Sequence, residues 1–302
     1  MMAVLKHELR NDFHSFTAYV FGAFLLAIVG VGSMLYNLQA AVSNFEYVLS
    51  FGSIVFVVIV PILTMRVIAE ERRQKTDQLL YALPITTTQV VLGKFAALLV
   101  VYLIPLAVIS VYPLLFAQFG DVYLPTSYGS LFAIFLLGAA LIALGIFLSS
   151  LTDNQGLAAG VGIAVILFNY YSVSLSEYVS STAFGSMVAI IVLIVVLYFV
   201  IRYLTKNEVL AYGVCFVLAA VVCVVGWTDA SKFEGLLPDI MRALSLFDRF
   251  SAFVSGVFDL TAIVYYLSVA AFFLFLSVQS LEKRRYNSCT TPGPPGPIPT
   301  WP

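Results

Sequence analysis

The sequence of 302 residues has little charge, few histidines and few cysteines. Lys, Arg, Asp and Glu make up 10% of it, whereas they make up about a quarter of a soluble domain. Its two histidines, His7 and His14, both precede the first long apolar run, which excludes a Ser–His dyad or a histidine-rich metal site within the membrane. Three cysteines do not make a disulfide framework in a chain of this length. These absences argue against a soluble domain and against an intramembrane hydrolase.

Most of the sequence is apolar. They form 61% of the chain, the mean hydropathy is +1.01, and they occur in runs of about twenty, the length of a membrane-spanning helix. We therefore predict an all-α integral membrane protein, a polytopic helical bundle of about eight transmembrane helices. One transmembrane domain would cover 1–286, and a disordered Pro/Gly-rich tail 287–302. The expected spans are 16–38, 47–66, 90–117, 130–151, 157–175, 185–204, 209–227 and 261–281.

The basic residues predict the topology through the positive-inside rule. With the N-terminus in the cytoplasm, twelve of the fifteen Lys and Arg residues fall on the cytoplasmic side. The loops at 39–46, 118–129 and 176–184 have none and are expected outside. Both termini are therefore expected in the cytoplasm.

The spans carry no charge near their centres, since Arg66, Lys94 and Arg202 all lie near expected cytoplasmic ends. Ion-coupled carriers usually place a charged group near mid-bilayer. The absence of such a group weakens the hypothesis that this protein is an ion-coupled carrier. The stretch LGKF, which contains Lys94, lacks the upstream glycine and the following Ser or Thr of a phosphate-binding loop. We therefore expect no ATPase site, no bound cofactor and no enzymatic activity in this chain.

The first sixteen residues predict a short amphipathic helix. Leu5, Leu9, Phe13 and Phe16 recur at helical spacing, with basic and polar residues between them. That pattern is typical of a helix lying in the cytoplasmic interface of a membrane. A plain solvated leader is the alternative.

Local signals also bear on how other helices begin, bend and pack. The stretch TTTQ, starting at Thr86, reads as a capping box before the third span. Pro105 and Pro113 should kink that span. Gly138 and Gly145 should let the fourth span approach a neighbour closely.

The segment 228–260 is too polar to span a membrane. Two apolar stripes predict two short amphipathic or re-entrant helices on the external side. The first stripe holds Leu236, Leu237, Ile240, Met241 and Leu244, and the second holds Phe250, Phe253, Val254 and Val257.

The densest charge in the chain lies in AEERRQKTDQLLYALPIT, residues 69–86. Read as a helix over 70–83, this stretch places Thr76, Leu79, Leu80 and Leu83 in one stripe on a polar cylinder. Two glutamates stand at its N-terminal end, where the helix dipole favours anions. We predict a cytoplasmic helix that docks a partner protein. The alternative is an ordinary basic loop beside the membrane, which leaves the acidic residues and the leucines unexplained.

The same stretch carries a family resemblance. EERRQKTDQLLYALPITTTQVVLGKF (Glu70–Phe95) resembles the coupling-helix region of bacterial type-2 ABC transporter permeases, and ALGIFLSSLTDNQ (Ala143–Gln155) is similar to the end of their fourth span. Residues 244–285 resemble their last external segment and final span, and are most similar to the subgroup named for gliding-motility and copper-processing permeases. Six spans are usual in that family, and this chain adds a hairpin at about 185–227.

The resemblance implies the membrane-spanning permease subunit of an ATP-driven ABC exporter in the bacterial cytoplasmic membrane. Its partners would be a separate cytoplasmic ABC ATPase, which holds ATP and Mg²⁺, and a second permease chain, as homodimer or heterodimer. The expected partner-binding residues of the coupling helix are Glu70, Glu71, Arg72, Arg73, Thr76, Asp77, Leu79, Leu80, Leu83 and Pro84. The alternatives are an ATP-independent carrier or channel, and a non-transporting membrane scaffold.

Overall fold

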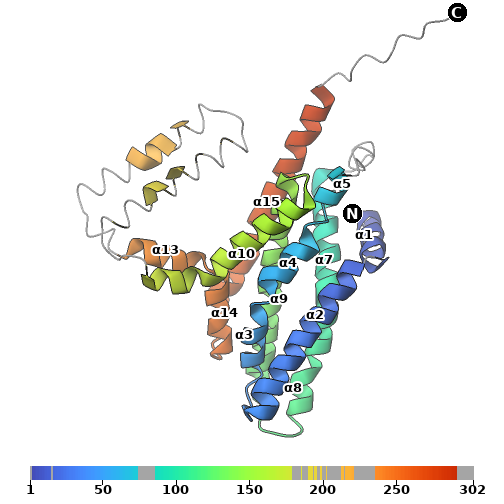
Figure 1. Cartoon of the computed structure of the whole chain (residues 1–302), viewed down its shortest axis with the longest axis vertical. Coiled ribbons are helices and arrows are strands. Elements are labelled where there is room, and N and C mark those ends of the chain that lie inside the picture. Colours follow the sequence, from blue (N-terminus) through green and yellow to red (C-terminus); the bar gives the residue numbers. More distant parts are fainter. Residues whose placement is uncertain are drawn as a thin grey trace, which may run out of the picture. The chain divides into compact units, whose positions relative to one another are not determined.

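The computed structural model describes residues 2–14, 16–73, 86–178 and 235–290, together with parts of 185–220. Within these residues the chain is helical and contains no strand. It divides into two compact units, one of residues 1–166 and 249–302 and one of residues 167–248. Figure 1 shows the helices, which are α1 (Met2–His14), α2 (Phe16–Ser33), the π-helix η1 (Met34–Gln39), α3 (Glu46–Ser53), α4 (Phe56–Thr64), α5 (Ala69–Arg73), α7 (Thr87–Ile109), α8 (Val111–Phe116), α9 (Leu124–Leu151), α10 (Gln155–Tyr178), α13 (Leu236–Leu244), α14 (Leu246–Val254) and α15 (Leu260–Thr290).

Five of the described helical segments are long and apolar enough to cross a membrane, and a bent pair of helices makes a sixth candidate. They correspond to six of the eight expected spans, so the chain is a multi-pass membrane protein. The expected spans at 185–204 and 209–227 fall largely outside the described residues, and the count of eight stays a prediction. The segments are Phe16–Gln39, Thr87–Phe116, Leu124–Leu151, Gln155–Tyr178 and Leu260–Lys283, with Glu46–Ser53 and Phe56–Glu71 as the bent pair.

The second expected span, 47–66, is broken rather than continuous. Helices α3 and α4 meet at a bend of 57°. There the N–H groups of Val55, Val57 and Val58 donate to carbonyls three residues earlier, each over 3.1 Å. This tighter 3₁₀-type pattern interrupts the α-helical ladder. Pro61 lies inside α4, beyond the bend, so no proline marks the break in the sequence.

The third expected span starts at the predicted cap and is interrupted before Pro113, whereas the helix has no break at Pro105. The side chain of Thr86 accepts a hydrogen bond from the Gln89 backbone N–H (3.4 Å) and caps α7, so the predicted helix start is confirmed. Helix α7 runs through Pro105 and ends at Ile109, and α8 follows from Val111. Pro113 has no N–H to donate to the Ile109 carbonyl, which explains the interruption.

Helix α9 is the most buried of the five unbroken candidate spans in the described chain. It packs against α3, α4, α7 and α15. The predicted close approach at its glycines is confirmed. A Cβ atom added at Gly138 would lie 2.5 Å from the ring of Tyr102, and one added at Gly145 would overlap the side chain of Thr64. The core of the first unit is therefore built around small residues of α9.

A buried carboxylate lies where α3 and α9 begin. Glu46 is 2% exposed, and its Oε1 accepts a hydrogen bond from Ser127 Oγ over 2.8 Å. The sequence predicts that Glu46 ends an external loop over 39–46, but it is the first residue of α3. Packing of the two helix starts, rather than local sequence, buries it.

The C-terminal part has the two short helices that the stripes predict, α13 and α14. Val257, the last member of the second stripe, lies beyond the end of α14. The expected tail boundary at 287 is also corrected, because α15 continues to Thr290. Residues 291–302 lie outside the described part of the chain.

Candidate functional site

Lys94 lies two turns into α7 and is 2% exposed. An ammonium group buried among apolar helices is costly unless it is paired and hydrogen-bonded. The groups that pair with Lys94 therefore define a position where several elements must stay together.

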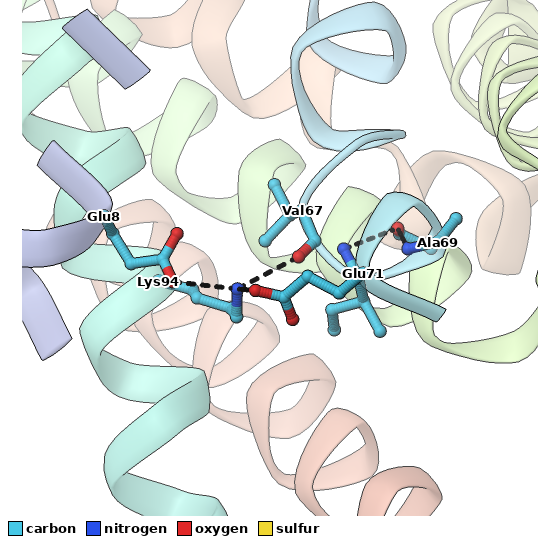
Figure 2. Close-up of polar contacts among 7 residues, drawn as sticks. Glu8, Val67, Ala69, Glu71 and Lys94 are labelled. Carbon is cyan, nitrogen blue, oxygen red and sulfur yellow. Dashed lines mark hydrogen bonds and ion pairs between the residues drawn. The ribbon is translucent and has the colours of Figure 1, made fainter. Parts of the chain in front are cut away.

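Three oxygens surround the ammonium group of Lys94 (Figure 2). Its Nζ donates to Glu8 Oε1 at 3.0 Å, to the Val67 carbonyl at 3.1 Å and to Glu71 Oε1 at 2.5 Å. An ammonium group has three donors, so each has a partner. Glu8 belongs to α1, Val67 to the turn after α4, and Glu71 to α5. One side chain of α7 thus joins the N-terminal helix to the start of the predicted coupling segment.

The residue before Lys94 explains why α1 comes so close. A Cβ atom added at Gly93 would lie 2.8 Å from Val4 Cγ1, so the absence of a side chain lets α1 lie against α7. Val4 and Glu8 are four residues apart and occupy one face of α1. The pair Gly-Lys in LGKF therefore docks α1.

Asp12 lies one turn beyond Glu8, on the same face of α1. Burial, and to a smaller extent the neighbouring Glu8 carboxylate, raise the pKa of Asp12 from 3.8 to about 6, while the Lys94 charge opposes that rise. A raised pKa means that the folded chain favours the protonated carboxyl. Ionised Asp12 therefore destabilises the docking of α1.

We expect Asp12→Asn to raise the thermal unfolding midpoint of the purified protein at pH 7.5. Above about pH 6 both states are ionised and the cost is fully present; it fades as the pH falls from about 6 to about 4, where only the folded state gains the proton. The difference between variant and wild type should therefore shrink as the pH is lowered. Asp121→Asn, at an exposed position, is the control. A difference that does not change with pH would contradict this account.

A serine of α9 holds the turn that leads from α4 into α5. The backbone N–H groups of Ile68 and Ala69 donate to Ser149 Oγ over 3.3 and 3.2 Å, and that hydroxyl donates to the Met65 carbonyl over 3.2 Å. Ser149 is fully buried. It satisfies backbone groups that a helix end otherwise leaves without partners. Figure 2 shows Ala69 and Glu71, which belong to α5 directly after this turn.

This arrangement joins the end of the bent span to α1, α7 and α9 through buried polar contacts.

Comparison with known protein families indicates what this part of the chain is. Residues 29–177 match the family model described as ABC-2 family transporter protein. The match supports an ABC-2 type permease, a membrane-spanning transport subunit. No curated protein matches the chain.

The matched segment contains Glu71, Lys94 and Ser149, whereas Glu8 precedes it. It covers the helices from the last five residues of α2 to α10 and leaves out α13, α14 and α15. The permease assignment therefore rests on the part of the chain that holds the predicted coupling segment. The resemblance to the gliding-motility and copper-processing subgroup stays an expectation.

The structure describes four of the ten predicted partner-binding residues, Glu70, Glu71, Arg72 and Arg73. Glu71 faces inward to Lys94, while Glu70 lies 3.8 Å from Arg66 in an ion pair one helical turn apart. Arg73 is exposed at the end of α5, and Arg72 belongs to the same helix. Described residues resume only at Thr86, so the rest lie outside the described part, namely Thr76, Asp77, Leu79, Leu80, Leu83 and Pro84.

Sequence reasoning misses Glu8, Lys94 and Ser149 as members of one site. A signal for Lys94 is present, since a charge within an apolar run needs a partner. Its partners are 86 and 23 residues away, and no spacing rule connects them. Ser149 is one of many serines in apolar runs, and nothing local distinguishes it.

Proposed function

We propose that this chain is the transmembrane permease subunit of an ATP-driven ABC exporter in the bacterial cytoplasmic membrane. A separate cytoplasmic ABC ATPase would bind ATP and Mg²⁺, and a second permease chain would complete the pathway. The observation that carries the proposal is the ABC-2 family match over residues 29–177. The apolar helices of the described chain support it.

The coupling segment 70–83 would receive the movement of the ATPase. Leu79, Leu80 and Leu83 would enter a groove on the ATPase, with the surrounding charges setting the orientation. Such coupling requires that the segment bind two states of the ATPase with different affinity. The contact between Glu71 and Lys94 supports a path from this segment into α7.

The contacts of Lys94 with Val67 and Glu71 connect α7 to the segment that follows α4. Val67 and Glu71 lie just after α4, the inner half of the bent span, and Lys94 lies near the start of α7. A displacement of the coupling segment would therefore act on α4 and α7 together. The bend between α3 and α4 would let the inner half of that span move separately from its outer half.

The double variant Leu79→Ser with Leu80→Ser tests the proposal. It removes apolar contact and keeps every charge, and interface cores of this kind lose on the order of 2 kcal/mol per buried side chain. We expect normal membrane insertion with loss of ATPase binding and of transport. Pull-down of a candidate partner ABC ATPase, from membranes carrying each variant, measures the binding.

The matched control is Leu79→Ile with Leu80→Ile, which keeps an apolar ridge and should retain the ATPase. Arg72→Gln with Arg73→Gln separates the proposal from the alternative of a basic loop on the lipid surface, for which the charges matter and the leucines do not. Full ATPase recovery and full transport after the change to serine would refute the coupling assignment.

A further inference from the structure

Helix α10 carries a polar stripe although it is apolar enough to span a membrane. Asn169, Ser172 and Ser176 are separated by three and four residues, so they lie on one face of the helix. Ser172 is 4% exposed and Ser176 is 3% exposed. Buried polar side chains in an apolar helix are expected to have specific partners.

The stripe also contacts residues in and just after α13, all within the unit of residues 167–248. The Ser172 and Ser176 hydroxyls donate to carbonyls of their own helix, those of Asn169 over 2.9 Å and Val173 over 2.6 Å. Ser172 Oγ lies 3.4 Å from the Met241 carbonyl, and Arg242 Nε donates to Ser176 Oγ over 3.2 Å. These contacts place the last turns of α13 along α10. The polar stripe is therefore a docking strip for a short amphipathic helix.

Asn169 makes the most specific contact, at the break between α13 and α14. Its Nδ2 donates to the Leu244 carbonyl over 3.0 Å, and its Oδ1 accepts from the Leu246 N–H over 3.0 Å. The last carbonyls of one helix and the first N–H groups of the next have no partner within their own helices. One side-chain amide thus satisfies both sides of the break.

The residue between the two helices completes the arrangement. Ser245 is fully buried, and its hydroxyl donates to the Asn169 backbone carbonyl over 3.4 Å. The same hydroxyl accepts from the Asp248 N–H over 3.2 Å, which caps the first turn of α14. Asn169 and Ser245 together hold the chain where α13 ends and α14 begins.

The chemistry of this position requires one donor and one acceptor on the same planar side-chain group. Asn carries a donor and an acceptor on one planar group, whereas an ionised Asp carries two acceptors and Leu carries neither. An ionised Asp would accept from the Leu246 N–H, but its second oxygen would face the Leu244 carbonyl. A protonated Asp again offers one donor and one acceptor.

We propose that Asn169 is the positioning residue that fixes the break between α13 and α14, and that it thereby sets the pose of this helix pair for transport. The transport part rests on the proposed permease function. The pose itself is independent of that function, because it depends only on contacts within residues 167–248.

The test measures the distance between α10 and α13 by pulsed electron paramagnetic resonance. The spin labels are placed at Glu177 and Asp239, which are both exposed. For labelling, the native cysteines of the full-length chain are replaced, namely Cys215, Cys223 and Cys289. The labelled protein is then reconstituted in lipid nanodiscs. In the parent chain we expect one narrow distance distribution. In the Asn169→Leu variant, loss of two hydrogen bonds should shift the ratio of docked to undocked α13 by roughly 10-fold to 30-fold.

The Asn169→Asp variant tests whether residue 169 acts through its hydrogen bonds. If residue 169 only filled space, the distance distribution of this variant would not depend on pH. Its distance distribution should be narrow at acidic pH, where the carboxyl is protonated, and broad at alkaline pH. The parent chain and Asn169→Leu should show no such dependence. Ser174→Leu, at an exposed position on the same helix, is the control and should keep the narrow distribution.

Distributions that do not change in Asn169→Leu, or that are independent of pH in Asn169→Asp, would overturn the proposal. If Asn169→Leu does not fold, the pH titration of Asn169→Asp decides alone. A transport assay with the partner ATPase then compares the same variants. Released α13 with unchanged transport would refute the transport part, whereas failure of the ATPase to bind even the parent chain would refute the permease function and leave the distance result standing.

Discussion

Replacing Lys94 with methionine should strongly destabilise the protein. Methionine fills a similar volume, but Glu8 and Glu71 then face each other without the cation that both bind. Removing one partner of a buried ion pair typically costs about 3–5 kcal/mol, because the remaining charge stays buried without compensation. The thermal unfolding midpoint in detergent should fall sharply.

Two further variants show whether uncompensated charge is the cause. Adding Glu8→Gln and Glu71→Gln to Lys94→Met removes the carboxylates as well, and we expect this triple variant to recover most of the lost stability. Lys6→Met, at an exposed position of α1, is the control and should change the midpoint little. If Lys94→Met unfolds at the wild-type temperature, the cluster does not hold α1, α5 and α7 together.

Gly138→Ala should also destabilise the protein clearly, although it adds only one methyl group. The added Cβ would lie 2.5 Å from the Tyr102 ring. That ring is fully buried, its hydroxyl donates to the Ile134 carbonyl over 2.7 Å, and Phe56 packs against it with ring centroids 5.8 Å apart. It has no free direction in which to move. Overpacking of this kind costs about 1–3 kcal/mol.

A double-variant cycle isolates the clash. Tyr102→Leu alone should destabilise by removing the ring, but in the Gly138→Ala background its cost should be smaller because it also relieves the contact. Gly129→Ala, on the same helix with nothing within 4 Å of its added Cβ, should be nearly neutral. Equal effects of alanine at Gly138 and Gly129 would show that α9 and α7 do not pack closely at Tyr102.

The sequence by itself determined the features that depend on neighbouring residues. Apolar runs of about twenty residues located the five candidate spans and the bent pair of the described chain, because a helix crossing hydrocarbon must satisfy its backbone within itself. The cap at Thr86, the interruption near Pro113 and the two helices of 235–254 followed from residues within a turn or two. The close approach at Gly138 and Gly145 follows as a tendency, but their partners Tyr102 and Thr64 do not.

Only the tertiary structure decided the contacts that join distant segments. The break in the second span falls at Ile54 and Val55, directly after Gly52 and Ser53. A Gly–Ser pair permits a sharp kink, but only the packing of the two helices sets its angle. Lys94 pairs with glutamates from two other elements, and Asn169 binds backbone groups 75 and 77 residues away. The physical reason is common to these cases. Local sequence sets which residues share a helix face, but which face meets which neighbour depends on how all the helices pack at once, and a buried polar group finds its partner only there.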